Sequence, residues 1–165
     1  MKRPVVALLV LVPLLAAIAG CGTTTPGGTP SAAPAIDATA FDGRAFALAA
    51  HAGQPVVINF WASWCAPCRS EMPLLERTAR ASEGRGVVFL GVATRDNEDA
   101  AQAFLREVGV TYPNIHDSDN AIATRYRVSG LPATVFIGRD GRIVRYWFGA
   151  LGDEQLATFV DEIAR

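Results

Sequence analysis

The most informative residues of the chain form one continuous segment, Val56-Val-Ile-Asn-Phe-Trp-Ala-Ser-Trp-Cys-Ala-Pro-Cys-Arg69. Val56–Trp61 is short, rich in β-branched residues and apolar on both faces, which is typical of a buried central strand. Cys65 and Cys68 follow it three positions apart, where a helix predicted from about Ala66 to Ser82 begins. Helix neighbours at this spacing have Cβ atoms about 5–6 Å apart, so a small backbone adjustment closes a disulfide between them.

The position of the two cysteines at a helix start predicts different roles for them. Cys65 faces the positive end of the helix dipole and several unpaired N–H groups, which stabilise a thiolate over a thiol. Pro67 costs no hydrogen bond in the first turn, because its missing N–H would have no partner there. Cys68 lies one turn further in and should be more buried. We therefore expect Cys65 to be the nucleophile and Cys68 to resolve the mixed disulfide.

Three other interpretations of the cysteine pair stay open at this stage. A zinc site would need two more ligands, and only Cys21, His51 and His116 remain to supply them. A purely structural disulfide would gain little from so short a loop, because the entropic stabilisation grows with loop length. A copper-delivery protein on a similar scaffold would space its cysteines C-x-x-x-C and pair them with a downstream histidine such as His116. The C-x-x-C spacing favours redox exchange over all three.

The rest of the chain predicts a mixed α/β domain, because short apolar strands alternate with helices. An N-terminal β-hairpin is indicated by Ala38–Phe41 and Ala45–Leu48 around Asp42-Gly43, a dipeptide suited to a tight turn. The later elements are expected to be a buried strand, a helix, a short helix, two strands and a final helix, at Val87–Val92, Glu98–Val108, Asn120–Tyr126, Thr134–Ile137, Ile143–Phe148 and Asp153–Ala164. A short turn joins the last two strands, so they should be antiparallel.

The N-terminal residues predict export and a lipid anchor. Residues 1–20 form a signal peptide, since Lys2 and Arg3 precede an apolar run that is too short to cross a bilayer core. Ile18-Ala-Gly-Cys21 resembles a bacterial lipobox, in which the cysteine is lipidated and becomes the first mature residue; the alternative is an ordinary leader followed by an incidental thiol. Residues 22–35 lack charged, aromatic and branched aliphatic side chains. Residues 21–35 are therefore predicted to be a disordered tether, and residues 36–165 the folded domain.

Composition excludes several classes of protein. A chain of 165 residues suits a single domain, and 15 Lys and Arg against 16 Asp and Glu, without a basic cluster, argue against nucleic-acid binding. Three cysteines and two histidines leave little material for a structural metal site, so no metal is expected. His116, Asp117 and Asp119 are accordingly predicted to be turn residues rather than metal ligands.

Trp64-Cys-Ala-Pro-Cys68, preceded by Val-Ile-Asn-Phe-Trp, resembles the active-site motif of the thioredoxin superfamily, and in particular its membrane-tethered, extracytoplasmic TlpA/ResA-like branch. The resemblance covers residues 36–165. It implies a thioredoxin fold: a central mixed sheet flanked by helices, with the N-terminal β-hairpin and a strand-helix insertion. It also implies that Leu131 and Pro132 form a loop in which a cis-proline faces the cysteines and helps to hold a substrate peptide.

Three more positions are interpreted through this resemblance. Asn59 follows the tethered branch, because cytoplasmic thioredoxins carry a buried Asp in its place. Ala133 departs from the pattern, since the residue after the cis-proline is commonly Thr, which here comes one position later as Thr134. Trp64 is expected to cover the edge of the disulfide and to contact the substrate.

Glu71 is the second candidate for acid–base chemistry. At about 100° per residue it lies about 60° from Cys68, and it is the only charged side chain that the projection places inside the apolar arc of the helix. Burial should raise its pKa, so that it can exchange a proton with Cys68. The alternative is a boundary glutamate whose carboxylate reaches solvent. The matching position is acidic in the resembling branch, which favours the relay role.

The function predicted from the sequence is a lipid-anchored thiol-disulfide oxidoreductase on the extracytoplasmic face of a bacterial membrane. Its redox group would be the Cys65–Cys68 pair without another cofactor, and its partners would be protein thiols and disulfides. The resemblance implies a membrane thiol-electron transporter as electron donor and apocytochrome c as an acceptor. Oxidation of exported proteins, the opposite direction, stays open. A peroxide reductase, which would carry Thr in place of Ala62, and a solute-binding or copper-binding lipoprotein are the alternatives from other classes.

Overall fold

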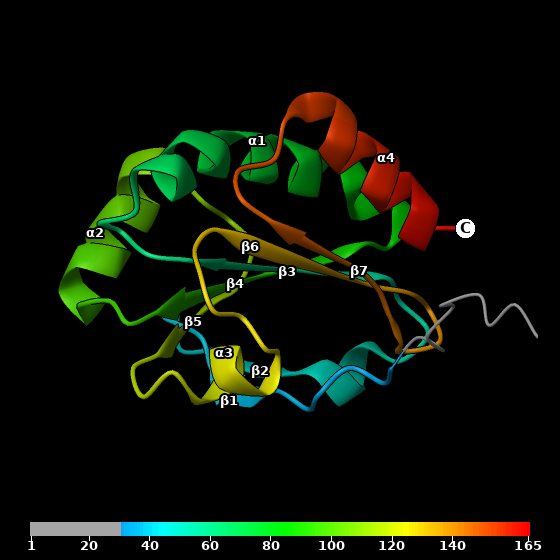
Figure 1. The fold of residues 1–165 in the computed structure, drawn as a ribbon, viewed down its shortest axis with the longest axis horizontal. Coiled ribbons are helices and arrows are strands. Elements are labelled where there is room, and N and C mark those ends of the chain that lie inside the picture. The colour runs from blue at the N-terminus through cyan, green and yellow to red at the C-terminus, as the bar shows by residue number, and fades with distance from the viewer. Residues whose placement is uncertain (1–30) are drawn as a thin grey trace, which may run out of the picture.

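A computed structural model describes residues 31–165 (Figure 1). Its central sheet has five strands in the order β5-β4-β3-β6-β7, which span Asn114–Asp117, Val88–Thr94, Val56–Trp61, Ala133–Ile137 and Ile143–Phe148. The β3–β4 and β4–β5 pairs are parallel, whereas the β3–β6 and β6–β7 pairs are antiparallel. A separate antiparallel pair is formed by β1 (Asp37–Thr39) and β2 (Ala45–Ala47). The mixed α/β architecture predicted from the sequence is confirmed.

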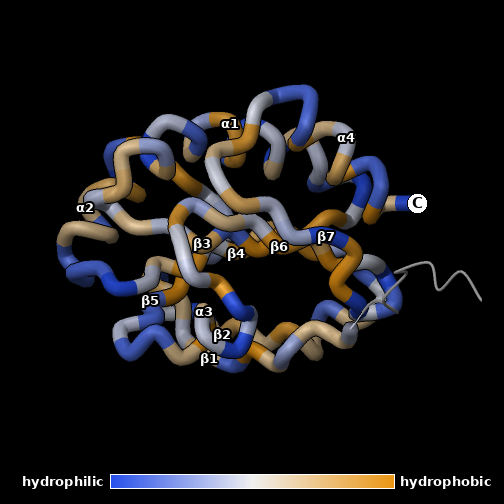
Figure 2. Tube along the Cα trace, in the orientation of Figure 1, coloured by the Kyte–Doolittle hydropathy of each residue, from blue (hydrophilic) through white to orange (hydrophobic). Residues whose placement is uncertain are grey.

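Helices cover both faces of the central sheet. The α-helices α1, α2, α3 and α4 span Ala66–Ser82, Glu98–Val108, Ala121–Arg125 and Asp153–Ile163, and the 3-10 helices η1 and η2 span Leu48–His51 and Glu83–Arg85. Figure 1 shows α1, α2 and α4 on one face, with α3 and the β1–β2 pair on the other. Apolar side chains fill both layers, and Figure 2 shows hydrophobic stretches on the central strands and on the helices that cover them.

The sequence of α1 explains both its bounds and its orientation. Cys65 is its N-cap residue and Pro67 lies in its first turn. Cys68, Met72 and Leu75 recur at the spacing of one helix face, and all three are fully buried against the sheet. The helix has the predicted bounds, and its buried face carries Cys68 into the core at the end of β3.

The strand β5 is not among the predicted elements. His116 and Asp117 lie on this strand, so the prediction that they are turn residues is wrong for them, whereas Asp119 lies in the turn that follows. Asn and Asp are uncommon in strands, which hides β5 in the sequence. The buried Asp117 carboxylate is satisfied because it accepts hydrogen bonds from the N–H groups of Ile122 and Ala123 at the start of α3.

Residues 31–35 lie against the domain, although the sequence placed them in the tether. The carbonyl of Ser31 accepts a hydrogen bond from Ile143 N at 2.9 Å, beside β7. The Tyr126 hydroxyl donates to the Pro34 carbonyl at 2.6 Å. These contacts use backbone atoms of the segment, which its lack of large side chains does not reveal. The packed domain therefore includes Ser31 and does not begin at residue 36.

The signal peptide, the lipidated Cys21 and residues 22–30 of the tether lie outside the described residues and stay predictions. Over residues 31–165, no helix is both long and apolar enough to cross a membrane.

Candidate active site

Cys65 and Cys68 form a disulfide at the start of α1, with an S–S distance of 2.03 Å and Cα atoms 5.2 Å apart. Both side chains are buried: Cys65 is 5% exposed and Cys68 is 0% exposed. The N–H of Cys68 donates to Cys65 Sγ at 3.3 Å. The outer sulfur therefore already faces a helix N–H group that would stabilise a thiolate.

Glu71 lies one turn after Cys68 and is buried, with 3% of its side chain exposed. Its Oε2 accepts a hydrogen bond from Leu151 N at 2.8 Å, and its Oε1 accepts one from Asn59 Nδ2 at 2.9 Å. Burial raises the pKa of Glu71 above its ordinary value, and these two hydrogen bonds oppose the rise only in part. The predicted burial is confirmed and the exposed alternative is excluded.

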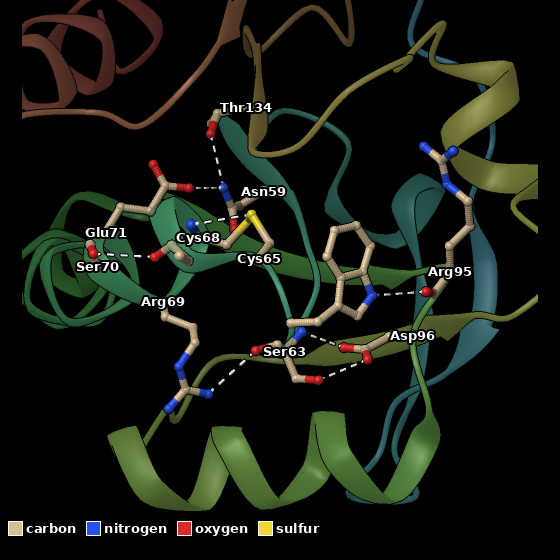
Figure 3. The surroundings of a disulfide bond; sticks show 12 residues. Asn59, Ser63, Cys65, Cys68, Arg69, Ser70, Glu71, Arg95, Asp96 and Thr134 are labelled. Atoms are coloured by element: carbon tan, nitrogen blue, oxygen red, sulfur yellow. Dashed lines mark hydrogen bonds between the residues drawn. A yellow bond between two sulfur atoms is a disulfide. The ribbon is translucent and has the colours of Figure 1, made fainter.

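Asn59 links Glu71 to Thr134 beside the cysteine pair (Figure 3). Its amide also donates to Thr134 Oγ1 at 3.1 Å, and both side chains are buried. Its Oδ1 has no hydrogen-bond partner among residues 31–165. Thr134, which the sequence marked only as a departure from the family pattern, thus belongs to the polar cluster at Glu71.

The peptide bond between Leu131 and Pro132 is cis, as the resemblance implied. The loop leads into β6, whose first residue, Ala133, pairs with Phe60 near the end of β3. Leu131 packs against the apolar cluster that contains both cysteines. The loop therefore lies at the same edge of the sheet as the disulfide, and its contact with a substrate stays a prediction.

Trp64 is 63% exposed, the most exposed of the large apolar side chains among the described residues. Its indole Nε1 donates to the carbonyl of Arg95 at 3.1 Å, in the loop after β4. The ring is thus fixed at one edge and open to solvent over most of its surface.

Glu76 corrects the helix projection, which placed Glu71 alone inside the buried arc. Glu76 is also buried, since Thr111 covers it and donates to both of its oxygens, from N at 2.9 Å and from Oγ1 at 2.8 Å. Burial alone would raise the pKa of Glu76, but these bonds and the Arg80 guanidinium outweigh it and lower the pKa. A helical projection includes only the residues of one helix, so it does not show that Thr111, from another segment, covers Glu76.

Comparison with known proteins decides the family. Residues 30–146 match the family model described as AhpC/TSA. The chain belongs to the AhpC/TSA family. The thiol-disulfide oxidoreductase ResA of Oceanobacillus iheyensis is 32% identical over 112 residues, which are 68% of this chain and 58% of that relative. The chain thus spans less than two thirds of that relative's length.

Solved structures of similar proteins carry the same fold. A secreted disulfide oxidoreductase of Mycobacterium tuberculosis has a TM-score of 0.71 and 33% identity, covering 77% of this chain and 95% of that one. A thioredoxin-family thiol:disulfide interchange protein of Chlorobium tepidum has a TM-score of 0.78 and 23% identity, covering 84% of this chain and 99% of that one. The thioredoxin fold predicted for this AhpC/TSA-family chain is confirmed, and both ResA and the secreted Mycobacterium tuberculosis protein are disulfide oxidoreductases by name.

The redox group of this AhpC/TSA-family site is the protein's own disulfide. Within the described part of the chain, no group of three or more His, Cys, Asp and Glu side chains is arranged to hold a metal ion. Cys65 and Cys68 are bonded to each other, and His116 instead approaches the carbonyl of Asp96, with 2.9 Å between Nε2 and O.

Ser63 and Asp96 contribute to the site and were missed in the sequence. The Asp96 carboxylate accepts hydrogen bonds from Ser63 N and, at 2.8 Å, from Ser63 Oγ. A signal was present, because each residue comes two positions after a strand of a parallel pair, β3 and β4. Such positions meet at the same edge of a sheet.

Proposed function

We propose that this chain exchanges disulfides with other proteins through Cys65 and Cys68, and that it works as a reductase. The observation that carries the proposal is the disulfide at the start of α1, whose outer sulfur accepts a hydrogen bond from Cys68 N. The names of its relatives support the same chemistry.

The reaction requires two exchanges. In the reduced protein, the Cys65 thiolate attacks one sulfur of a partner's disulfide, a Cys65–partner S–S bond forms, and the partner's own S–S bond breaks. The released partner sulfur takes up a proton. Cys68 then loses its proton and attacks Cys65 Sγ, which restores the Cys65–Cys68 disulfide and releases the second partner thiol. Two electrons and two protons reach the partner.

Glu71 is proposed to accept the proton of Cys68 in the second exchange. Its buried carboxylate, one helical turn away, has a raised pKa, which makes it a better base than an exposed glutamate. Asn59 and Leu151 hold its two oxygens, so the group stays in place while its protonation changes.

The substrate is proposed to lie between Trp64 and the loop of Leu131 and Pro132. Trp64 offers an exposed apolar ring, and the loop lies at the same edge of the sheet as the disulfide.

Export and anchoring complete the proposal. The lipobox-like residues before Cys21 support lipidation at that cysteine, on the outer face of a bacterial membrane. A membrane thiol-electron transporter would then return electrons to the disulfide, and apocytochrome c is the candidate substrate. Replacing Cys21 with Ser should abolish incorporation of a labelled fatty acid; incorporation that persists would refute this assignment.

The test of function is reduction of a disulfide-bonded model protein by thiols. The wild-type chain should accelerate it, and the Cys65→Ser variant should not. Consumption of hydrogen peroxide with no acceleration of disulfide reduction would support the peroxide reductase instead. The direction of electron transfer is tested by thiol alkylation, which measures the redox state of Cys65 and Cys68 in cells. Mostly reduced cysteines support the reductase, and mostly oxidised cysteines support a donor of disulfides.

A further inference from the structure

The turn that precedes Cys65 is tied to the loop after β4 by one carboxylate. Asp96 Oδ1 accepts from Ser63 Oγ at 2.8 Å and from Asn97 N at 2.9 Å, and Asp96 Oδ2 accepts from Ser63 N. The adjacent Arg95 carbonyl holds the Trp64 indole at 3.1 Å. Figure 3 shows Ser63, Arg95 and Asp96 together on one side of the disulfide.

The loop adopts a backbone conformation that requires support. Arg95 has φ of 52°, in the left-handed region that few residues other than glycine occupy. Such residues concentrate at functional sites, where the surrounding contacts hold them in place. Here the contacts are those of the next residue, Asp96, whose backbone carbonyl also lies 2.9 Å from His116 Nε2. The loop is therefore fixed from both sides, by the cysteine turn and by β5.

We propose that Asp96 is a positioning residue for the cysteine pair, and that its charge makes the Cys65–Cys68 dithiol a stronger reductant. The two bonds to Ser63 fix the turn from which Cys65 projects. A carboxylate bonded to Ser63, two residues before the N-cap residue Cys65, opposes the helix N-terminus, since it disfavours negative charge on the Cys65 sulfur. Dithiol proteins that act as strong oxidants do so because their reduced form, with its thiolate, is stabilised. A charge that destabilises the Cys65 thiolate therefore makes the dithiol a better electron donor.

The other charges around Cys65 leave Asp96 as the anion nearest its turn. Glu71 lies on the buried side, one turn below Cys68. Arg69 donates to the Ser63 carbonyl at 3.4 Å, but its charge is paired with Glu107, whose two oxygens each accept from it at 3.0 Å, and its guanidinium lies 4.2 Å from the Phe104 ring. The Arg95 side chain is exposed to solvent, which screens its charge.

The test separates the charge of Asp96 from its hydrogen bonds. Asp96→Asn removes the charge and, with its amide oxygen toward Ser63 N, keeps that bond while giving up the one from Asn97 N. Asp96→Ala removes the charge and all of these bonds. Asp99→Asn is the matched control, because Asp99 is an exposed carboxylate in the first turn of α2 and has no bond to Ser63. The readouts are the pH midpoint of Cys65 alkylation in the reduced protein and the equilibrium of the disulfide with glutathione.

In Asp96→Asn the alkylation midpoint should fall by about 0.5–1 pH unit, and the equilibrium constant for reduction by glutathione should rise about 3- to 10-fold. Asp99→Asn should change neither. Asp96→Ala should show the same shifts and, in addition, faster hydrogen exchange at Ser63 N. Equal behaviour of Asp96→Asn and Asp99→Asn would overturn the charge effect, and unchanged exchange in Asp96→Ala would overturn the positioning role.

This inference deepens the proposed function and rests on it, but the two fail separately. Alkylation and the glutathione equilibrium need no protein substrate. A chain that reduces no partner protein would refute the proposed function while still reporting the effect of Asp96.

Discussion

Asn59 donates its side-chain amide to Glu71 at 2.9 Å, and neither side chain reaches solvent. The contact joins the central strand β3 to the helix that carries both cysteines. It fixes the carboxylate of Glu71 one turn below Cys68, where a proton must leave when the disulfide re-forms. The acid–base chemistry of the site is therefore built into the packing of α1 on the sheet.

Replacing Glu71 with Gln should slow disulfide exchange by on the order of a hundredfold, the lower end of general acid–base catalysis, and flatten its dependence on pH. The reason is that Gln cannot accept the proton of Cys68, whereas the buried Glu71 carboxylate, whose pKa is raised by burial, can. Stopped-flow measurement of exchange between pH 6 and pH 9, about the range where thiols begin to ionise, checks this. An unchanged rate profile would remove Glu71 from the mechanism.

Replacing Glu71 with Gln should also change how the free energy of unfolding depends on pH. The pKa of Glu71 in the folded protein lies above its ordinary value of 4.5, so the folded state binds the proton more tightly than the unfolded state. The wild type should therefore lose stability relative to Glu71→Gln as pH rises from about 4.5 through the raised pKa. Urea unfolding of both proteins across this range measures the difference, and a difference that stays constant with pH would contradict the burial argument.

Replacing Glu76 with Gln should give the opposite dependence on pH. The pKa of Glu76 is lowered in the folded protein, so its stabilisation is present above its ordinary value of 4.5 and is lost as pH falls through the lowered value. The variant should be less stable by about 1–3 kcal/mol at neutral pH, the usual cost of losing hydrogen bonds to a charged group. The same urea series tests this, and a deficit that grows toward acid pH would be inconsistent with it.

Replacing Gly91 with Ala should destabilise the domain by about 2–4 kcal/mol. A Cβ atom at Gly91 would lie 1.7 Å from Asn114 Oδ1, which accepts the hydrogen bond of the Trp61 indole. The methyl group would therefore displace Asn114 and leave a buried N–H unpaired. Gly84→Ala is the control, because nothing lies within 4 Å of its Cβ position. Similar unfolding midpoints for the two variants would rule out this account of β4.

Replacing Tyr126 with Phe should loosen residues 31–35 by about 0.5–1.5 kcal/mol, because the hydroxyl donates to the Pro34 carbonyl. Hydrogen exchange at Ala33 N, which donates to Gly141, should become faster. Tyr146→Phe is the matched control, since it removes a hydroxyl from a more exposed ring on β7 and leaves the Tyr126–Pro34 hydrogen bond in place. If both variants exchange at the same rate as the wild type, the hydroxyl does not hold the segment.

The sequence was sufficient for the features that depend on local pattern. The bounds of α1 and the placement of Cys65 and Cys68 at its start follow from a buried strand, a proline in the first turn and a helical apolar repeat. The burial of Glu71 follows from its place on that helix. The cis bond before Pro132 followed from resemblance alone.

The features that were missed depend on contacts between distant segments. β5 is polar in sequence and becomes a strand by pairing with β4. Glu76 is buried because Thr111 covers it. The bonds between Ser63 and Asp96 form because two parallel strands end side by side, and a single sequence does not give the register that brings them together.

The most direct test of the central claim is covalent trapping with Cys68→Ser. This variant keeps the nucleophile and lacks the thiol that resolves the mixed disulfide, so it should accumulate a bond between Cys65 and a cysteine of a disulfide-bonded model protein, detected by mass spectrometry of the intact adduct. The matched Cys65→Ser variant should trap far less, since Cys68 is 0% exposed. Equal trapping by the two variants, or no adduct with Cys68→Ser, would contradict the assignment of Cys65 as the nucleophile of a thiol-disulfide oxidoreductase.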